Sequence, residues 1–413
     1  MAGGMLEGVR IVDLTSVVIG PLATQILADN GAEVIKVESP EGDIGRWLSG
    51  RGRHEDMGPK FLHLNRNKRS ICLDLKRPSA RRALLALLDK ADVLTWNIRP
   101  AAMARLGLSY DEVRRVKPNI IYCGMFGFDQ RGPYADVPAY DPIIQGSAGV
   151  AALNAMAFGE PRFLPYVLAD RTCGLIAVQM IAMALFHRER TGEGQSIEVP
   201  MFENMVTQVL TEQLYLHTFV PPIGPLGDPR LLNRFYAPSR TLDGYISLTA
   251  NTNAQVFPLM EAMGHAGFRD DPRFNTVAAR FANVTEYFRL RAEGLQKQTT
   301  AFWLELCRRH DIPAAPYHTL ESLLEDPHLA AVGLLREVEH PSEGRLIDLA
   351  PANTVSSGSR RDWLPAPRLG EHTESILADA GYSEQEIAAL LGEGAARTAG
   401  PARAAPPERP AAT

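Results

Sequence analysis

Cysteine is scarce in this sequence, and its distribution excludes two kinds of stabilised small fold. Only four cysteines occur among the 413 residues, and no two of them form a C-x-x-C pair. Thiols this far apart are typical of a reduced, cytosolic protein, and they argue against a disulfide framework or a structural zinc site. We therefore expect a cytoplasmic protein without a metal site.

Long apolar runs and an excess of basic residues are also missing. The longest apolar stretch, residues 174–186, contains Gln179 and is shorter than a membrane span, so it predicts a buried helix. Residues 1–8 lack the basic and apolar regions of a signal peptide. A formal net charge of -5 leaves no basic footprint of general nucleic-acid binding. The sequence thus predicts neither a membrane nor a nucleic acid as partner.

The common fingerprints of nucleotide and hydrolase sites are absent as well. The turn over residues 16–21 holds one glycine, whereas the G-x-G-x-x-G dinucleotide motif needs three. Neither a Walker A sequence nor a G-x-S-x-G nucleophile elbow occurs. The histidines show no metal-ligand spacing. We expect no permanently bound cofactor.

An alternation of strand and helix patterns fills the first half of the chain. Residues 9–14 and 33–38 are typical of strands, and the segment between them has helical apolar spacing. Pro21 and Gly31 fit the start and the end of that helix. The pattern repeats, with strands expected over residues 70–75, 93–96, 120–125 and 196–199 and a helix opening at Ser79. Such units imply right-handed crossovers and an α/β domain with a parallel sheet.

The length and a change in composition predict a second, smaller domain. A chain of 413 residues is too long for one ordinary core, and residues 220–232 are rich in proline and glycine. A strand after an Asp-Gly turn, within residues 241–249, opens the second unit. We expect a large domain over residues 1–219, a linker and small domain over 220–330, a second linker with a return to the large domain over 331–391, and a disordered tail over 392–413.

Asp170 is the candidate nucleophile. It stands where a predicted strand, residues 166–169, meets the apolar helix of residues 174–186. Open α/β folds place their chemistry at the carboxyl ends of strands. An aspartate at a helix start is more commonly only an N-cap. The two roles are compatible, because a helix N-terminus favours the ionised carboxylate that nucleophilic attack requires.

Basic residues recur at the predicted strand–helix junctions. They are Arg46, Arg51 and Arg53, the cations within residues 65–69, Lys76, Arg99 and Arg105. Cations at such junctions can engage phosphate groups. Any single cluster is more often a solvated charged face, so both interpretations stay open from the residues alone.

Ten motifs in the same order resemble one known family. They are residues 20–21, 27–38, 65–70, 73–76, 97–100, 105–110, 127–134, 139–141, 169–170 and 191–195. Together they resemble the class III CoA-transferases, the formyl-CoA and carnitine CoA-transferase family. The resemblance is dense from residue 6 to about residue 205 and looser to about residue 375.

This resemblance implies a large doubly wound, Rossmann-like α/β domain, a small α+β domain and two chains interlocked in a homodimer. It implies Asp170 as the catalytic aspartate and an acyl-CoA as substrate. The implied coenzyme A contacts are Val17, Val18, Ile19, Leu73, Lys76, Asn97, Ile98, Arg99, Arg105, Ala139, Tyr140 and Asp141. The formyl-CoA enzymes carry a glutamine at the position of Val18, which disfavours formyl and oxalyl substrates here. Their glycine-rich flap is not evident either.

The implied reaction is that of a transferase of sulfur-containing groups. Asp170 attacks the donor thioester to give a mixed anhydride, and the coenzyme A thiolate then forms an aspartyl-CoA thioester for the acceptor acid. Candidate donors to the developing oxyanions are the backbone N–H groups at the helix start or around Gly146 and Gly149.

Two other functions compete with this one. The first is an α-methylacyl-CoA racemase of the same fold, but that branch uses a histidine where Tyr140 stands, and a neutral tyrosine is a poor base near neutral pH. The second is a non-catalytic CoA-binding protein, which leaves Asp170 at its junction unexplained. The sequence therefore favours a transferase.

Three arginines suggest the substrate pair. Arg171, Arg234 and Arg240 are each candidates to pair with the distal carboxylate of a dicarboxylic acid. The sequence thus suggests succinyl-CoA as donor and a small dicarboxylate as acceptor.

Overall fold

The computed structural model describes residues 4–356 and 363–400, and the chain forms two compact units. Unit 1 comprises Met1–Ile144, Tyr166–Met205 and Val332–Thr413, and unit 2 comprises Gln145–Pro165 and Val206–Ala331. Unit 2 therefore includes Gln145–Pro165, which the sequence assigned to the large domain. Its second segment begins at Val206, before the linker that was expected from residue 220. The return to unit 1 at Val332 falls beside the boundary expected at residue 331.

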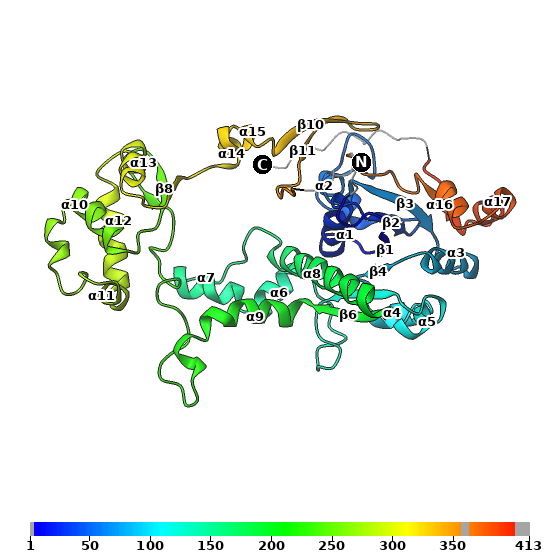
Figure 1. Cartoon of the computed structure of the whole chain (residues 1–413), viewed down its shortest axis with the longest axis horizontal. Coiled ribbons are helices and arrows are strands. Elements are labelled where there is room, and N and C mark those ends of the chain that lie inside the picture. Colours follow the sequence, from blue (N-terminus) through cyan, green and yellow to red (C-terminus); the bar gives the residue numbers. More distant parts are fainter. Residues whose placement is uncertain (1–3, 357–362, 401–413) are drawn as a thin grey trace. The chain divides into compact units, whose positions relative to one another are not determined.

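Unit 1 is built on one seven-stranded sheet (Figure 1). Its strands are β1 (Arg10–Leu14), β2 (Glu33–Glu38), β3 (Lys68–Leu73), β4 (Val93–Trp96), β5 (Ile121–Phe126), β6 (Gln195–Pro200) and β12 (Ala396–Arg397). The spatial order is β12-β3-β2-β1-β4-β5-β6, and every neighbouring pair is parallel except β12 with β3. The expected α/β fold with a parallel sheet is confirmed. The strand order reverses between β1 and β4, the switch point at which doubly wound sheets bind ligands.

Helices cover both faces of this sheet. They are α1 (Ile19–Asp29), α2 (Pro59–Asn65), α3 (Pro78–Asp89), α4 (Pro100–Arg105), α5 (Tyr110–Val116), α8 (Leu168–Thr191), α16 (Thr373–Asp379) and α17 (Glu384–Gly392), with a 3-10 turn η1 (Ile44–Arg46). One face packs Val12, Ile35 and Leu94 against α3, α5, α16 and α17 in a single apolar core. On the other face, α8 contacts α1, β5 and β6. A hairpin of β10 (Leu335–His340) and β11 (Gly344–Leu349) completes unit 1.

The sheet face that lies against α1 carries charged side chains. Side chains alternate across a strand, so Val12 enters the apolar core while Asp13 points to the opposite face. There Asp13 accepts a hydrogen bond from Thr24 of α1 at 2.6 Å. Lys36 is the register partner of Asp13 on β2, and Lys68 of β3 donates to the Pro21 carbonyl of α1 at 3.0 Å. The alternation of side chains therefore places Asp13, Lys36 and Lys68 on the sheet face beneath α1, the helix that follows β1.

Helix α8 is buried along one side only. Cys173, Ala177 and Ile181 are buried, whereas Met183 and Phe186 are 53% and 64% exposed. The expectation of a buried helix over residues 174–186 therefore holds for one face. By length and composition this helix could cross a membrane, but core helices pass the same test, so the feature is weak evidence.

Two local expectations differ from the structure. Residues 166–169 form no strand, because α8 already begins at Leu168 and places Asp170 in its first turn. The tail expected to be disordered from residue 392 instead forms β12, which adds to the edge of β3. The N–H of Asp74 donates to the Ala395 carbonyl at 2.9 Å, and the Thr373 hydroxyl donates to the Arg397 carbonyl at 2.7 Å. Residues 401–413 of that predicted tail lie outside the described residues.

Unit 2 combines helices with a small antiparallel sheet. Its strands are β7 (Ser239–Arg240), β8 (Tyr245–Leu248) and β9 (Ala314–Pro316), in that spatial order. Its helices are α7 (Val150–Phe158), α10 (Asn253–Ala262), α11 (Val277–Ala282), α12 (Val284–Leu295), α13 (Thr300–Arg309), α14 (Leu320–Leu324) and α15 (Pro327–Ala331), with 3-10 turns η2 (Tyr215–Thr218) and η3 (Ala266–Arg269). Helices α6 (Asp141–Ser147) and α9 (Met201–Gln213) start in unit 1 and end in unit 2.

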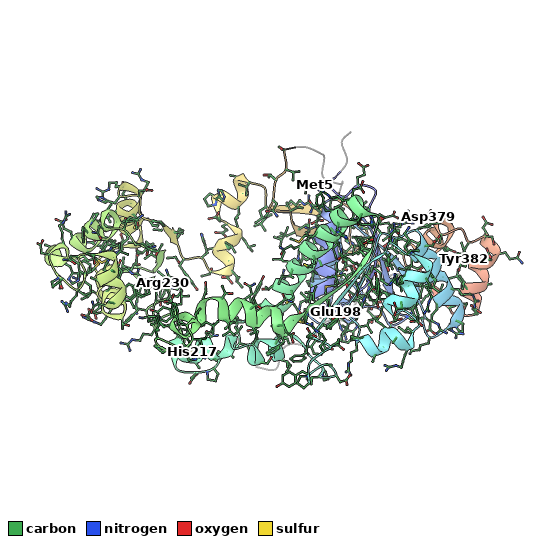
Figure 2. All side chains as sticks on the ribbon, turned by 60° about the horizontal axis from the view of Figure 1, so that its bottom comes forward. Met5, Glu198, His217, Arg230, Asp379 and Tyr382 are labelled. Atoms are coloured by element: carbon green, nitrogen blue, oxygen red, sulfur yellow. The ribbon has the colours of Figure 1, made fainter. Side chains whose placement is uncertain are left out.

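The core of unit 2 gathers around Trp303. This side chain is fully buried in an apolar cluster with Phe274, Leu259 and other residues of α10, α12 and α13. Its indole N–H donates to the Leu295 carbonyl at 2.7 Å, which satisfies the one polar atom of the side chain. Between α9 and β7 the chain is mostly irregular, and His217 and Arg230 in Figure 2 mark that stretch.

Candidate active site

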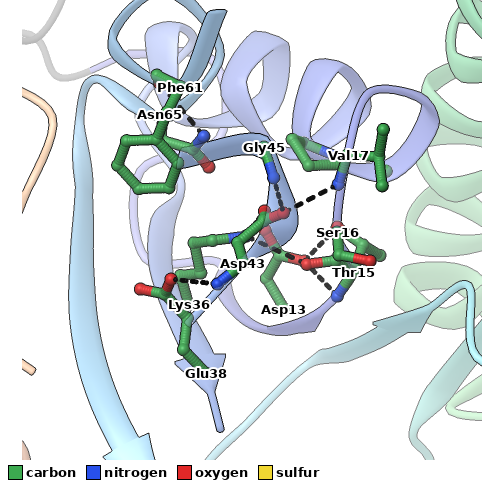
Figure 3. Close-up of polar contacts among 12 residues, drawn as sticks. Asp13, Thr15, Ser16, Val17, Lys36, Glu38, Asp43, Gly45, Phe61 and Asn65 are labelled. Carbon is green, nitrogen blue, oxygen red and sulfur yellow. Dashed lines mark hydrogen bonds and ion pairs between the residues drawn. The ribbon is translucent and has the colours of Figure 1, made fainter. Parts of the chain in front are cut away.

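The loop that follows β1 has a strained conformation that neighbouring side chains hold in place. Val17 adopts a φ of 69°, which is uncommon for a β-branched residue. Its N–H donates to Asp43 Oδ1 at 3.0 Å, as Figure 3 shows. Asn97, which follows β4, accepts from the Ser16 N–H and donates to the Ser16 carbonyl, both at 2.9 Å. The loops at the carboxyl ends of β1 and β4 are thus fastened to each other.

A buried lysine links this loop to the next strand. Lys36 Nζ donates to the Thr15 carbonyl at 2.9 Å and pairs with Asp43 Oδ2 at 2.8 Å (Figure 3). Burial alone would raise the pKa of Asp43, but Lys36 and the N–H groups of Val17 and Gly45 lower it below its usual value. Asp43 is therefore a carboxylate that neutralises a buried ammonium and orients the loop at the same time.

A second buried pair supports the first. Lys68 Nζ lies 3.3 Å from Asp13 Oδ2, and both side chains are fully buried. Burial lowers the pKa of Lys68 to about 8, against the opposing charge of Asp13. Asp13 also accepts from the Thr15 N–H at 2.8 Å, so the loop is anchored at its first residue as well.

Two glycines allow close packing around α1. A Cβ on Gly174 of α8 would lie 2.8 Å from the Ile19 carbonyl oxygen of α1, whereas one on Gly20 of α1 would lie 2.1 Å from the Thr15 side chain in the loop after β1. Residues four apart share one face of a helix, so Asp170 lies on the side of α8 that Gly174 presents to α1. The close approach therefore brings the carboxylate toward the loop after β1.

Asp141 caps the helix that carries Asp170. Asp141 Oδ2 accepts from the Ala169 N–H at 2.7 Å and from the Asp170 N–H at 3.1 Å. The expected N-cap role thus belongs to Asp141, and the carboxyl group of Asp170 is left for other chemistry. These two N–H groups are thus already occupied, and oxyanion donation from the start of α8 or from around Gly146 and Gly149 stays a prediction.

The carboxyl group of Asp170 lies in an environment that favours its neutral form. Burial is the main cause that raises the pKa of Asp170 to about 7, and the charge of Asp141 adds to it, against Lys60 and Arg171. We expected the helix N-terminus to favour the ionised form, but burial and Asp141 outweigh it. A carboxyl group poised near neutral pH is a feature of functional sites.

Asp170 lines a pocket of about 440 Å³ at the switch point of the sheet. Eight of the twelve expected coenzyme A contacts line the same pocket: Val17, Val18, Ile19, Asn97, Arg99, Arg105, Ala139 and Tyr140. Arg99 and Arg105 are exposed there, where their charges can reach a phosphate. The pocket also takes in Ile44, Gln130 and residues 135–138, which the sequence did not single out because they come from loops without a chemical signature.

The other four expected contacts lie elsewhere. Leu73 is 1% exposed within the apolar core, and Ile98 packs against that core. The Lys76 N–H donates to Asp74 Oδ1 at 3.2 Å after the end of β3. Asp141 serves as the cap described above. A role in binding coenzyme A stays a prediction for all twelve residues.

Most of the basic clusters expected at phosphates are engaged inside the protein. The side chain of Arg46 is 1% exposed, pairs with Glu38 at 2.7 Å and stacks 3.7 Å above the Phe61 ring. Arg66 pairs with Asp29 at 2.7 Å and with Asp348 at 3.1 Å. Arg51 and Arg53 line a different cavity of unit 1. Of these clusters, only Arg99 and Arg105 are among the residues that line the pocket of Asp170. Arg46 and Arg66 have carboxylate partners, and Arg51 and Arg53 line another cavity.

The arginines proposed for a distal carboxylate do not line the Asp170 pocket. Arg171 lies 5.3 Å above the Tyr166 ring, and its Nε is buried without a hydrogen-bond partner within the described chain. Arg234 is exposed and stacks on Phe235, and Arg240 is exposed on β7.

Over residues 4–356 and 363–400, no three His, Cys, Asp or Glu side chains gather so as to hold a metal ion.

Comparison with known proteins points to a single family. The model of CoA-transferase family III matches residues 6–373. A succinate–glutarate CoA-transferase of Agrobacterium fabrum is 33% identical over 381 residues, covering 91% of this chain and 95% of the relative. A succinyl-CoA:glutarate CoA-transferase of Mus musculus is 32% identical, covering 94% and 89%. A formyl-CoA:oxalate CoA-transferase of Rhodopseudomonas palustris is 33% identical, covering 98% and 99%.

Solved structures agree with this. A CAIB/BAIF family protein from Brucella suis superposes with a TM-score of 0.76 at 29% identity, covering 92% of this chain and 100% of that one. Rv3272 from Mycobacterium tuberculosis, in an orthorhombic crystal form, gives a TM-score of 0.78 at 29% identity, covering 91% and 99%.

Proposed function

Since the chain belongs to CoA-transferase family III, we propose that it moves coenzyme A from succinyl-CoA to a small dicarboxylic acid through covalent intermediates on Asp170. The observation that carries this proposal is the placement of Asp170. Its carboxyl group is not used as a helix cap, is poised near neutral pH, and lines a pocket with two exposed arginines. The proposal places the enzyme among the transferases of sulfur-containing groups.

The pocket supports the binding of an acyl-CoA. Arg99 and Arg105 come from the loop after β4 and from α4, and both line the pocket beside residues of the β1 loop. Guanidinium groups pair with phosphates through several N–H donors. The thioester of the bound molecule then faces the loop over Val17 and Val18, whose apolar side chains keep water from the reacting carbonyl.

The reaction exchanges one activated carboxyl group for another. The Asp170 carboxylate attacks the thioester carbonyl, and the carbon–sulfur bond breaks to leave an aspartyl anhydride and the thiolate of coenzyme A. The thiolate attacks the Asp170 carbonyl, forms an aspartyl thioester and releases the donor carboxylate. The acceptor carboxylate then attacks the aspartyl thioester, which gives a second anhydride and frees the thiolate. The thiolate attacks the acceptor carbonyl of this anhydride, which forms the new acyl-CoA and releases Asp170. No proton has to be moved, and Asp170 ends as a carboxylate.

The choice of a dicarboxylate rests on the relatives. Two of them carry names that pair succinate or succinyl-CoA with glutarate. The formyl-CoA:oxalate enzyme is equally similar in sequence, but the expected glutamine of that branch is Val18 here. We therefore favour a succinyl donor and a four- or five-carbon dicarboxylic acceptor.

Trapping of the intermediate tests the function. Purified protein is incubated with succinyl-CoA and hydroxylamine, and its peptides are analysed by mass spectrometry. We expect a hydroxamate on Asp170 and none on the neighbouring carboxylate Asp141, with no label in an Asp170→Asn variant. Acceptor acids are then compared in a transfer assay. A protein that gains no label from succinyl-, acetyl- or butyryl-CoA would not be acting through Asp170.

We also propose that the enzyme acts as a homodimer in the cytoplasm. The face of α8 that holds Leu175, Met183 and Phe186 is apolar and exposed, and apolar patches of this kind mark interaction sites. All four cysteines are buried free thiols, as a reducing compartment favours. Light scattering of the purified chain would give twice the monomer mass, and Phe186→Glu would lower it.

A further inference from the structure

Helix α12 of unit 2 carries one charged residue on its apolar side. The buried positions of this helix are Val284, Tyr287, Phe288, Arg291, Gly294 and Leu295. Their spacing of three and four residues is that of a single helix face packed against a core. Arg291 interrupts this face and is 5% exposed. A guanidinium in such a position carries its charge into the protein, because arginine does not lose its proton there.

Within the described chain, no carboxylate compensates this charge. Arg291 forms a side-chain hydrogen bond with Tyr287, but its Nε is buried without a hydrogen-bond partner among residues 4–356 and 363–400. The guanidinium carbon lies 4.5 Å from the centre of the Phe288 ring and 5.7 Å from that of Tyr287. Aromatic rings attract a cation, and the Tyr287 side chain supplies a hydrogen bond, but neither supplies the opposite charge that a desolvated guanidinium needs.

Arg291 lines a pocket of about 730 Å³ that lies wholly within unit 2. The pocket wall also includes Arg230, labelled in Figure 2, and no aspartate or glutamate. Exposed polar side chains from β8 and the segment after it, Ser247, Thr249 and Asn251, line the same space. The pocket therefore combines a buried cation, a second cation and neutral hydrogen-bonding groups, which is the composition that recognises an anion.

We propose that this pocket is a carboxylate site, in which Arg291 pairs with a free carboxylate of a short-chain dicarboxylic acid. A carboxylate supplies the charge and the two acceptor oxygens that the fork of a guanidinium matches. The planar fork favours a carboxylate over a monovalent halide. The anion site itself does not depend on the proposed function. Only the identification of its ligand as the acceptor acid, or as the acyl part of a thioester, rests on that function.

Neighbouring Arg289 offers a matched control. It lies on the same helix two residues away, forms exposed ion pairs with Glu286 and Glu293, and does not line the pocket. The same substitution at the two positions therefore removes the same charge from helix α12, once inside the pocket and once outside it.

Binding to the full-length protein tests the site. Glutarate and pentanoate are titrated calorimetrically into the wild type, Arg291→Met and Arg289→Met. The two acids have the same number of carbons and differ by one carboxylate. We expect the wild type and Arg289→Met to prefer glutarate by roughly ten- to hundredfold, and Arg291→Met to lose this preference. No preference in the wild type, or an unchanged preference in Arg291→Met, overturns the proposal.

Melting temperature separates a binding role from a structural one. Replacing an uncompensated buried charge by an apolar side chain of similar length is expected to leave the ligand-free protein at least as stable. Glutarate should then raise the melting temperature of the wild type and not that of Arg291→Met. If Arg291→Met does not fold, Arg291→Lys keeps the charge without the fork, and an unchanged glutarate affinity in that variant contradicts the site.

Transfer kinetics connect the site to the reaction. With succinyl-CoA as donor, Arg291→Met should lower kcat/KM for glutarate and leave the value for pentanoate within about twofold. Absence of transfer with every donor and acceptor would sink the proposed function but not the carboxylate site, because the binding titration does not depend on turnover. Equal losses for both acids would show that Arg291 supports the fold and not the recognition of a carboxylate.

Discussion

Asp141 Oδ2 accepts hydrogen bonds from the backbone N–H groups of Ala169 and of Asp170 itself, at 2.7 and 3.1 Å. One carboxylate thus caps the helix that presents the other. The cap fixes the first turn of α8, and its negative charge also raises the pKa of Asp170. Asp141 is therefore a positioning residue whose charge influences the titration of the proposed nucleophile.

The pH dependence of transfer follows from this pair. The pKa of Asp170 is raised to about 7, and only the carboxylate attacks a thioester. We expect kcat/KM of the wild type to rise with pH through an apparent pKa near 7. Asp141→Asn keeps an acceptor oxygen for the cap and removes the charge, so its profile should shift to lower pH. A shift to higher pH, measured at fixed ionic strength, would contradict the assigned influence.

Asp170→Asn is expected to lower the activity and to raise the stability of the folded protein. Loss of the proposed nucleophile should lower kcat by about a thousandfold or more. Because the folded pKa exceeds the usual value, the folded state binds more protons than the unfolded state between about pH 4 and pH 7, and the wild type loses stability as pH rises through this window. The asparagine does not titrate.

The stability difference has a defined upper bound and a clear readout. A rise from 3.8 to about 7 corresponds to at most about 4 kcal/mol at pH 8, before any relaxation of the site. Thermal unfolding at pH 4 and pH 8 measures it. The advantage of Asp170→Asn over the wild type should be larger at pH 8, and an equal difference at both pH values would refute a raised pKa of the half-buried Asp170.

The hydrogen bond from the Val17 N–H to Asp43 can be tested separately from the ion pair between Asp43 and Lys36. Asp43→Asn retains an oxygen for the Val17 N–H, whereas Asp43→Ala removes it. Both variants leave buried Lys36 without its carboxylate partner, and both should lose about 3–5 kcal/mol of stability. Beyond that shared loss, release of the β1 loop should lower kcat of Asp43→Ala by a further ten- to hundredfold or so.

Stability and turnover of the two Asp43 variants have to be measured together. Thermal unfolding gives the shared loss, and transfer assays well below the melting temperature give the loop effect. Asp271→Asn, which breaks an exposed pair with Arg273, is a control expected to change stability by less than about 0.5 kcal/mol. Equal kcat in Asp43→Asn and Asp43→Ala would mean that the loop does not depend on this bond.

Replacing Arg99 or Arg105 should weaken the binding of the acyl-CoA. Each arginine replaced by glutamine removes one charge from the pocket without creating a buried gap, so KM for the acyl-CoA should rise by roughly tenfold or more. The increase should shrink at high salt, because screening weakens exposed charges. Arg115→Gln on α5, exposed and outside the pocket, should leave KM unchanged. An effect on kcat alone would place the two arginines elsewhere in the mechanism.

The sequence predicted the scaffold of unit 1 better than the chemistry around it. Strands β2 and β4 fall where expected, since long-range pairing reinforces their apolar patterns. The apolar run before Asp170 was wrongly expected to be a strand, because four residues carry too little periodicity to separate a strand from a helix start. Asp170 was singled out as the candidate nucleophile from its place beside the long apolar helix together with the family resemblance, and its catalytic role stays a prediction.

Partners far apart in the chain account for most of the remaining errors. Arg66 pairs with Asp348, 282 residues later, so a local basic cluster gave no sign that it was already neutralised. Arg291 was overlooked, although its place on the apolar side of α12 is visible in the spacing of the sequence. Arg289 and Arg291 differ in exposure only because the core of unit 2 packs against one side of the helix.

The close packing of α1 against the loop after β1 and against α8 has a consequence for how mutational scans of this enzyme should be interpreted. Any side chain at Gly20 or Gly174 would collide with atoms that have little room to move, the Thr15 side chain in one case and the Ile19 carbonyl in the other. Both positions will score as intolerant as Asp170 when activity is selected, although neither contributes a reacting atom. A scan selected on activity will therefore report where the backbones are packed closely, and assays of folded protein abundance will be required to distinguish the proposed nucleophile from these glycines.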